Sequence, residues 1–157
     1  MSFITRPVKP GDLEAIVNQS GQFGYQTTRI KTKQRLQAIL YHADHRLLVA
    51  EKDMVIAGYI HAVFMLSITS DPFIEITGLV IDEKFRRQGI GKILVEEIIQ
   101  WAGIRQCSLI RVRSNILRRE AHAFYTSIGL SELKIQRVYE LKTSISQNAS
   151  QHRSGKD

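Results

Sequence analysis

The residues best suited to chemistry lie in the stretch 79–95, where an apolar strand leads through a short basic loop into two glycines and a helix. Gly89 and Gly91 allow the backbone to turn tightly and to approach a ligand without an intervening Cβ. A helix that starts here directs free N–H groups and the positive end of its dipole toward an anion. Positive charge is added at the same point by Arg86, Arg87 and Lys92. The pattern therefore predicts a loop that binds phosphate.

The spacing argues against two other phosphate-binding loops. A dinucleotide-binding loop needs a third small residue where Leu94 stands, and an acidic residue at the end of the next strand, which ends in Arg113. A Walker loop needs Ser or Thr after its Gly-Lys, so that a hydroxyl can bind magnesium, and here Ile93 follows Lys92. Magnesium-dependent nucleotide hydrolysis is therefore not expected.

Two motifs remain, one in the loop and one nearer the C-terminus. The first is Arg86-x-x-Gly89-x-Gly91, which directly follows a strand over residues 75–81. The second is the segment 121–130, which reads AHAFYTSIGL. They resemble the acetyl-CoA signature and the A-x-x-F-Y-x-x-x-G-[FL] segment of the GCN5-related N-acetyltransferase (GNAT) family. The resemblance implies an α/β fold in which helices flank a mixed, mostly antiparallel central sheet, with acetyl-CoA as cosubstrate.

The resemblance also implies which residues bind the cosubstrate. In the family, the backbone of the strand before the loop binds the pantetheine arm and thioester, and an asparagine and a tyrosine lie near the arm and the sulfur. The corresponding residues, with those of the loop, are Leu79, Val80, Ile81, Arg86, Arg87, Gln88, Gly89, Ile90, Gly91, Lys92, Asn115 and Tyr125. Simpler alternatives stay open, because residues 79–81 also suit a core strand and Asn115 also suits the start of a helix.

Transfer to an amine would need a base and an acid. A lysine-like amine has a pKa of about 10.4, so it must lose a proton before it can attack a thioester. The resemblance assigns the base to Glu75, a carboxylate in an otherwise apolar strand, whose alternative is a solvated or arginine-paired side chain. It assigns the acid that protonates the departing thiolate to Tyr125, whose alternative is a structural or cofactor-contacting role.

The acceptor is expected between the loops 19–28 and 67–72, which flank the cleft in this fold. Phe23, Tyr25, Asp71 and, on a neighbouring strand, His61 are candidates to contact it, although a lone strand histidine is more often structural. Cys107 has no sequence sign of a base beside it, so an acetyl-cysteine route is not expected. No His, Cys, Asp and Glu spacing suggests a metal. The patterns do not identify the amine.

These features predict an N-acetyltransferase that passes the acetyl group of acetyl-CoA directly to a primary amine of a small molecule or peptide in a ternary complex. Backbone N–H groups of the strand would stabilise the oxyanion. The alternative is an acetyl-CoA-binding sensor or partner module without catalysis. The presence of both Glu75 and Tyr125 argues against that alternative.

Composition predicts the setting of the protein. The chain has 157 residues and a net charge of +7, and its basic residues cluster near the loops that a phosphate-bearing cofactor would touch, so no nucleic acid partner is expected. A single cysteine and the lack of a signal sequence or a long apolar run predict a cytoplasmic protein that does not cross a membrane. A homodimer is left open, because edge strands in this fold often pair between subunits.

Chain length and composition predict one domain over residues 1–142 and a mobile polar tail over 143–157. Hydrophobic periodicity predicts strands over 3–8, 47–51, 55–65, 73–81, 108–112 and 134–141. It predicts helices over 13–18, 32–41, from residue 90 to about 102, and from about 120 to 128. The third helix is expected to pack through Ile90, Leu94, Ile98 and Ala102 and to pair Lys92 with Glu96 on its other face. The strand 108–112 should pair in parallel with 73–81. Asp12 is expected to cap the first helix and Gly129 to end the last.

Overall fold

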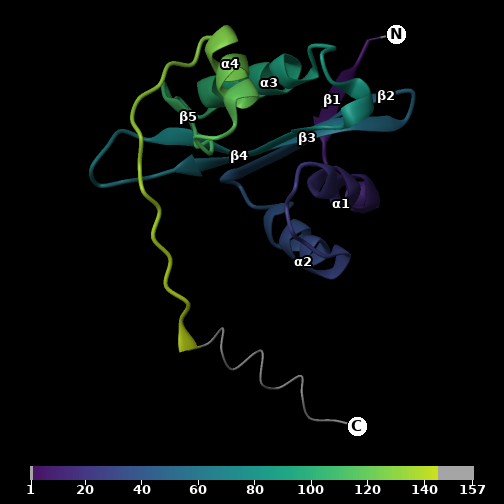
Figure 1. The fold of residues 1–157 in the computed structure, drawn as a ribbon, viewed down its shortest axis with the longest axis horizontal. Helices are drawn as coiled ribbons and strands as arrows, with labels where there is room; N and C mark the ends of the chain where they lie inside the picture. The colour runs from purple at the N-terminus through teal and green to yellow at the C-terminus, as the bar shows by residue number, and fades with distance from the viewer. Residues whose placement is uncertain (1, 145–157) are drawn as a thin grey trace. The chain divides into compact units, whose positions relative to one another are not determined.

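The computed structural model describes residues 2–144 (Figure 1). The chain divides into two compact units, one up to Ala121 and one that begins at His122. The first unit contains the whole sheet and the first three α-helices. The mobile tail expected from residue 143 onward lies almost entirely outside the described residues.

The centre of the first unit is a five-stranded sheet in the order β1-β2-β3-β4-β5. Neighbouring strands are antiparallel except β4 and β5, which are parallel, so the predicted mixed, mostly antiparallel sheet is confirmed. The strands are β1 (Ile4–Pro7), β2 (His45–Lys52), β3 (Val55–Met65), β4 (Phe73–Ile81) and β5 (Ile110–Val112). β3 and β4 have the predicted bounds. β5 begins two residues later than predicted, because only its last three residues pair with β4.

The turn between β2 and β3 consists of Asp53 and Met54, which both have positive φ angles of 51° and 64°. A two-residue turn with this geometry matches the right-handed twist of antiparallel strands. The sequence pattern predicted the end of β2 at residue 51, one residue before its observed end at Lys52.

Helices cover the two faces of the sheet (Figure 1). α1 (Leu13–Gln22) and α2 (Arg29–Ile39) lie on one face, and α3 (Ile90–Ile104) lies on the other. On the α1 and α2 side, a buried cluster joins side chains of both helices to the sheet: Val8, Leu13, Ile16, Leu36, Val49, Tyr59 and Val80. On the α3 side, the face with helical spacing that was predicted to pack is buried: Ile90, Leu94, Ile98 and Ala102.

The first helix starts at Leu13 as predicted, but its cap and the start of the second helix differ from the prediction. Asp12 belongs to a 3-10 turn, η1 (Pro10–Asp12), and makes no side-chain cap to α1. Its carboxylate instead accepts the Lys9 N–H at 2.8 Å and two hydrogen bonds from Arg6. Burial raises the pKa of Asp12, but these hydrogen bonds outweigh burial and hold it below its ordinary value. α2 begins at Arg29 rather than Thr32, because the Thr28 hydroxyl caps it by accepting the Lys31 N–H.

The predicted loop 19–28 is shorter in the structure. α1 continues to Gln22, four residues beyond its predicted end, so the connection to α2 begins at Phe23. The side chains of Gln19 and Ser20 are buried in this last turn of α1, and the Ser20 hydroxyl bonds both the Ile16 carbonyl and the Tyr59 hydroxyl. These buried hydrogen bonds explain how a polar stretch continues the helix.

The last helix, α4 (Arg119–Ser127), crosses the boundary between the two units. Gly129, with a φ of 100°, ends it as predicted, and the Leu130 N–H returns to the Tyr125 carbonyl at 3.0 Å. The strand predicted over 134–141 is wrong: residues 130–143 form neither strand nor helix. Alternating side chains are not enough for a strand, which also needs a hydrogen-bonded neighbour, and no described strand pairs with this segment.

Candidate functional site

The glycine loop connects β4 to α3. After β4 come a short 3-10 turn, η2 (Glu83–Phe85), and then Gly89, which precedes α3 with a φ of 79°. The first helical hydrogen bond of α3 runs from the Ile93 N–H to the Gly89 carbonyl, so the earlier N–H groups of the helix have no partner within it. A Cβ on Gly89 would meet nothing within 4 Å, so its backbone conformation, not its space, requires glycine.

The side chains around this helix start are exposed and mostly positive: Arg86, Arg87, Gln88 and Lys92. Arg86 lies 4.0 Å from Glu83, and Lys92 lies 3.9 Å from Glu96, the pair predicted at this helical spacing. Both are loose, solvent-exposed ion pairs of small energetic value. The arrangement therefore combines fixed backbone donors with mobile cations, which suits a diphosphate group.

β4 and β5 separate just before this loop. They pair only through Ile74, Glu75 and Ile76, which face Ile110, Arg111 and Val112. From Thr77 onward, β4 keeps its pairing with β3 but has no ladder to β5. Backbone groups along this open edge are therefore available to an extended ligand. The predicted residues 79–81 lie here; the Val80 side chain is buried in the core, and the role of their backbone in binding stays a prediction.

Glu75 lies in the part of β4 that still pairs with β5, and its side chain forms an ion pair. Its side chain is 14% exposed and its Oε1 lies 2.6 Å from Nε of Arg113, whose side chain is 68% exposed. The arginine-paired alternative considered for Glu75 is thus what the structure contains. Phe73 and Arg111 come two residues before Glu75 and Arg113. The Arg111 guanidinium lies 4.2 Å from the Phe73 ring centroid.

Hydrogen-bonded polar side chains cross the sheet from Thr77, two residues after Glu75. The register of β3 and β4 shifts between His61 and Ala62, which leaves Thr77 as an extra residue. The Thr77 hydroxyl lies 3.0 Å from Nδ1 of His61, and Nε2 of His61 lies 2.8 Å from Nδ1 of His45. Burial, with a smaller contribution from His45, lowers the pKa of His61 to about 4. His61 is therefore neutral near neutral pH and serves as a hydrogen-bonding group on the sheet.

The two aromatic acceptor candidates lie together after α1. The rings of Phe23 and Tyr25 are 5.2 Å apart, and the Arg118 guanidinium lies 3.6 Å from the Phe23 ring centroid. Phe23 also packs against the α1 and α2 core, whereas Tyr25 is 45% exposed. Tyr25 is therefore the better placed of the two to contact a ligand.

The remaining predicted residues fall in different places. Asp71 is exposed in the loop before β4. Asn115 is exposed and its Oδ1 accepts the Leu117 N–H at 2.9 Å, so it shapes the turn before α4. Tyr125 belongs to the unit that begins at His122, where its ring lies 5.4 Å from that of Phe124, and its role as the acid stays a prediction. Cys107 is buried, and its Sγ lies 3.2 Å from the Pro72 carbonyl oxygen.

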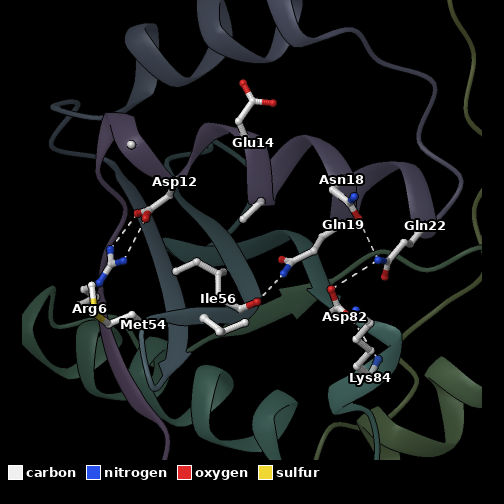
Figure 2. A pocket seen from close by; sticks show the side chains of 13 residues that line it. Arg6, Asp12, Glu14, Asn18, Gln19, Gln22, Met54, Ile56, Asp82 and Lys84 are labelled. Carbon is white, nitrogen blue, oxygen red and sulfur yellow. Dashed lines mark hydrogen bonds and ion pairs between the residues drawn. The ribbon is translucent and has the colours of Figure 1, made fainter.

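A concavity of about 560 Å³ lies between α1, the β2–β3 turn and the segment after β4 (Figure 2). Its polar groups largely satisfy one another. Arg6 binds Asp12, Gln19 donates to the Ile56 carbonyl, and Gln22 bridges Asn18 and Asp82. The concavity therefore has the character of a hydrogen-bonded surface, and it contains neither Glu75 nor Tyr125.

Two further features concern only residues 2–144. No group of three His, Cys, Asp or Glu side chains in this part of the chain is arranged to hold a metal ion. None of the helices found there has the length and apolar character needed to cross a bilayer.

The chain matches the Acetyltransferase (GNAT) family over residues 13–130. This match covers most of the sequence and contains the glycine loop, Glu75 and the segment with Tyr125, so the protein belongs to the acetyltransferase (GNAT) family. The resemblance inferred from the two motifs is thereby confirmed. None of the curated proteins matches the chain.

Solved structures have the same fold. A GNAT family acetyltransferase from Staphylococcus aureus is 27% identical, with a TM-score of 0.73 over 90% of this chain and 100% of that chain. Glucosamine-6-phosphate N-acetyltransferase from Arabidopsis thaliana is 21% identical, with a TM-score of 0.76 over 90% and 100%. The aminoglycoside N-acetyltransferase AAC(6')-Iy in complex with CoA is 16% identical, with a TM-score of 0.81 over 90% and 96%.

The sequence patterns missed the partners of Glu75. They grouped the basic residues with the cofactor loops, whereas the structure brings Arg111 to Phe73 and Arg113 to Glu75. They also gave no role to Thr77 and His45. A usable signal was present in the sequence. Arg111 and Arg113 are two residues apart at the end of β5, as Phe73 and Glu75 are two residues apart in the strand predicted to pair with it in parallel.

Proposed function

We propose that the protein is an N-acetyltransferase that transfers the acetyl group of acetyl-CoA to a primary amine, with both substrates bound at once. The observation that carries this proposal is the continuity of two features along one stretch of chain. The open edge of β4 leads directly to the helix start at Gly89, so backbone groups for an extended arm precede donors for a diphosphate. The CoA complex of a protein with the same fold supports this assignment.

The residues present fit that cosubstrate. The N–H groups at the start of α3, with Arg86, Arg87 and Lys92, would bind its diphosphate, and the backbone of residues 79–81 would bind its pantetheine arm. When bound, it supplies an acetyl group activated as a thioester. Backbone N–H groups at the open edge of β4 would stabilise the negative charge that develops on the acetyl oxygen.

Glu75 is the proposed base. It would accept the proton of the bound ammonium, directly or through a water, so that the amine nitrogen can attack. Its Oε1 contacts Nε of Arg113 at 2.6 Å, so an approaching amine meets this side chain beside a guanidinium group. Arg113 is largely exposed, so it can move aside when the amine binds. Tyr125 is the proposed acid that protonates the departing thiolate.

The test is a thiol-release assay with acetyl-CoA and a panel of primary amines, run beside a calorimetric measurement of acetyl-CoA binding. Acetyl transfer predicts acetyl-CoA binding and thiol release that depends on the amine and yields one acetylated product for each thiol. Binding without thiol release from any amine would favour an acetyl-CoA sensor instead. The absence of acetyl-CoA binding would contradict both functions.

A further inference from the structure

One surface beside the proposed base has a distinctive arrangement of charge. We call it the Glu75 face, and it consists of Phe73, Glu75 and Thr77 of β4 with Arg111 of β5 and Arg113, which directly follows β5. Arg113 pairs with Glu75, and Arg111 lies over the Phe73 ring, so both arginines are on the same side of the sheet as Glu75. The Thr77 hydroxyl contacts His61, which places the polar side chains of β3 and β4 on that side too.

The Glu75 face lies on the α1 and α2 side of the sheet but beyond the core beneath those helices. Tyr59 and Val80 face each other across β3 and β4 and belong to that core. Val63 faces Glu75. Val63 is four residues after Tyr59 in β3, which is roughly 13 Å at the rise of an extended strand. Val63 and Glu75 are outside the buried cluster, and Arg113 is 68% exposed. A small ligand can therefore reach these charges.

The charges on the Glu75 face are unequal. Glu75 is the only acidic residue in β3, β4 and β5, whereas two guanidinium groups flank it. Arg111 forms no ion pair within the described part of the chain, and its ring contact leaves the edge of the guanidinium available for hydrogen bonds. The neighbouring His61 is neutral near neutral pH. With Glu75 ionised, this face keeps an excess of positive charge.

We infer that the acceptor is an amine that also carries an anionic group, a carboxylate or a phosphate, close to its nitrogen. This inference rests on the proposed acetylation of an amine and names the class of that amine. Its ammonium would bind Glu75, and its anionic group would bind Arg113 and Arg111. Guanidinium groups bind both anions through paired, charge-assisted hydrogen bonds.

An exchange of ion pairs explains the selectivity. An ammonium that binds Glu75 competes with Arg113, because Arg113 already contacts Oε1 of that carboxylate. An amine whose only charged group is its ammonium would leave the displaced guanidinium without a partner. The two positive charges would then lie close together. An amine with a nearby anion replaces one ion pair by two, so the displaced arginine gains a new partner. A polycationic amine meets two arginines and only one carboxylate, which disfavours it by repulsion.

The first test compares acceptors that differ only by the anionic group. Suitable pairs are glucosamine 6-phosphate with glucosamine, 2-aminoethyl phosphate with ethanolamine, and 4-aminobutyrate with butylamine; spermidine and kanamycin represent polycations. We expect kcat/KM for thiol release to be roughly 10- to 100-fold higher for the anionic member of at least one pair, the range for hydrogen bonds to charged groups. The difference should lie mainly in KM, because the anion binds without taking part in the transfer.

The second test removes the arginines one at a time. Arg113→Ala and Arg111→Ala should each reduce the preference for the anionic acceptor by about 10-fold and leave acetyl-CoA affinity unchanged. Arg113→Lys, which keeps the charge but loses the planar fork, should fall between wild type and Arg113→Ala. Lys52→Ala is the matched control, because Lys52 also lies over a phenylalanine ring, Phe3, but on β2 rather than β5.

The outcomes separate this inference from the proposed function. Equal or better use of neutral amines or polycations would overturn the inference and leave amine acetylation standing. Weaker acetyl-CoA binding in Arg113→Ala and Arg111→Ala, with an unchanged acceptor preference, would also overturn it by assigning the arginines to the cosubstrate. Acetyl-CoA binding without thiol release from any amine would contradict the proposed function and the inference together.

Discussion

The loop at the start of α3 offers backbone N–H groups to a ligand, whereas the Glu75 face offers charged side chains. The loop is made from neighbours in sequence, and its shape depends on the left-handed conformation of Gly89. The Glu75 face is assembled from two strands separated by the whole of α3, and its charges are held by contacts between β4 and β5. A backbone site should be sensitive to conformation and a side-chain site to charge. Substitutions at the two regions should therefore have different effects.

The largest effect is expected at Gly89. Gly89→Val should abolish measurable acetyl-CoA binding, because a β-branched residue is strongly disfavoured at a φ of 79° and would reshape the helix start. Isothermal calorimetry of acetyl-CoA binding measures this, and thermal unfolding checks that the variant folds. Gly103→Val is the matched control, since Gly103 is in the same helix, has no positive φ and has open space around it. Near-normal acetyl-CoA affinity of the folded Gly89 variant would contradict the proposal that this loop binds the cosubstrate.

The next largest effect is expected at Glu75. Glu75→Gln should lower kcat by roughly 10²–10⁴-fold, as expected for loss of a general base, with acetyl-CoA affinity nearly unchanged. A rise in pH should partly restore the rate, because more of the amine is then already neutral. Steady-state kinetics across pH provides the measurement.

The ion pair with Arg113 gives the comparison that separates a base from a structural carboxylate. If Glu75 only holds Arg113, then Glu75→Gln and Arg113→Gln should destabilise the protein similarly and leave kcat similar to wild type. Wild-type rates for Glu75→Gln at neutral pH would mean that the proton leaves by another route, such as a water on the strand backbone.

The two regions also differ in how far the sequence could predict them. The loop could be predicted because its glycines, its basic residues, the preceding apolar strand and the following amphipathic helix are adjacent in the chain. β4 and the buried face of α3 were predicted for the same reason, since each has an uninterrupted hydrophobic pattern. Such features depend on local conformation, which the residue types largely determine.

The contacts of Glu75 could not be predicted in this way. The parallel pairing of β4 with β5 was expected, but its register, which sets Glu75 against Arg111 and brings Arg113 within reach, depends on how α3 packs across the sheet. The extra residue Thr77 shifts the faces of β4 and brings its hydroxyl to His61. The alternation of 134–141 led to the opposite error, because it predicts a strand without showing that a partner strand exists.

A smaller effect, on stability, tests the histidine next to the Glu75 face. Burial holds the pKa of His61 at about 4 in the folded protein, below about 6.5 for an exposed histidine. The unfolded chain therefore binds this proton more readily, so the free energy of unfolding should fall as the pH drops from 6.5 toward 4. His61 should account for about 2 kcal/mol of the loss between pH values of about 7.5 and about 5.

Urea unfolding of wild type and His61→Asn at both pH values measures this contribution. The variant should lose less stability on acidification, whatever its stability at the higher pH. Some dependence should remain, because burial, with the charge of His42, also lowers the pKa of His45. The arginine-bonded carboxylate of Asp12 titrates below its usual range and should contribute only at lower pH. An equal loss in both proteins would show that His61 is readily protonated in the folded state.

The smallest effect is expected at Arg86, where a side chain contributes to the backbone site. Its side chain is 49% exposed, its ion pair with Glu83 is 4.0 Å long, and its Nε lies 3.4 Å from the Ile81 carbonyl oxygen, so it is loosely held. Arg86→Ala should weaken acetyl-CoA binding by only about 3- to 10-fold and reduce its dependence on salt, because exposed charges act through a screened field. Lys33→Ala, at an exposed position in α2, should change neither property. Calorimetric titrations at low and high salt measure both. A loss as large as that of Gly89→Val would show that the loop depends on its arginine as much as on its backbone.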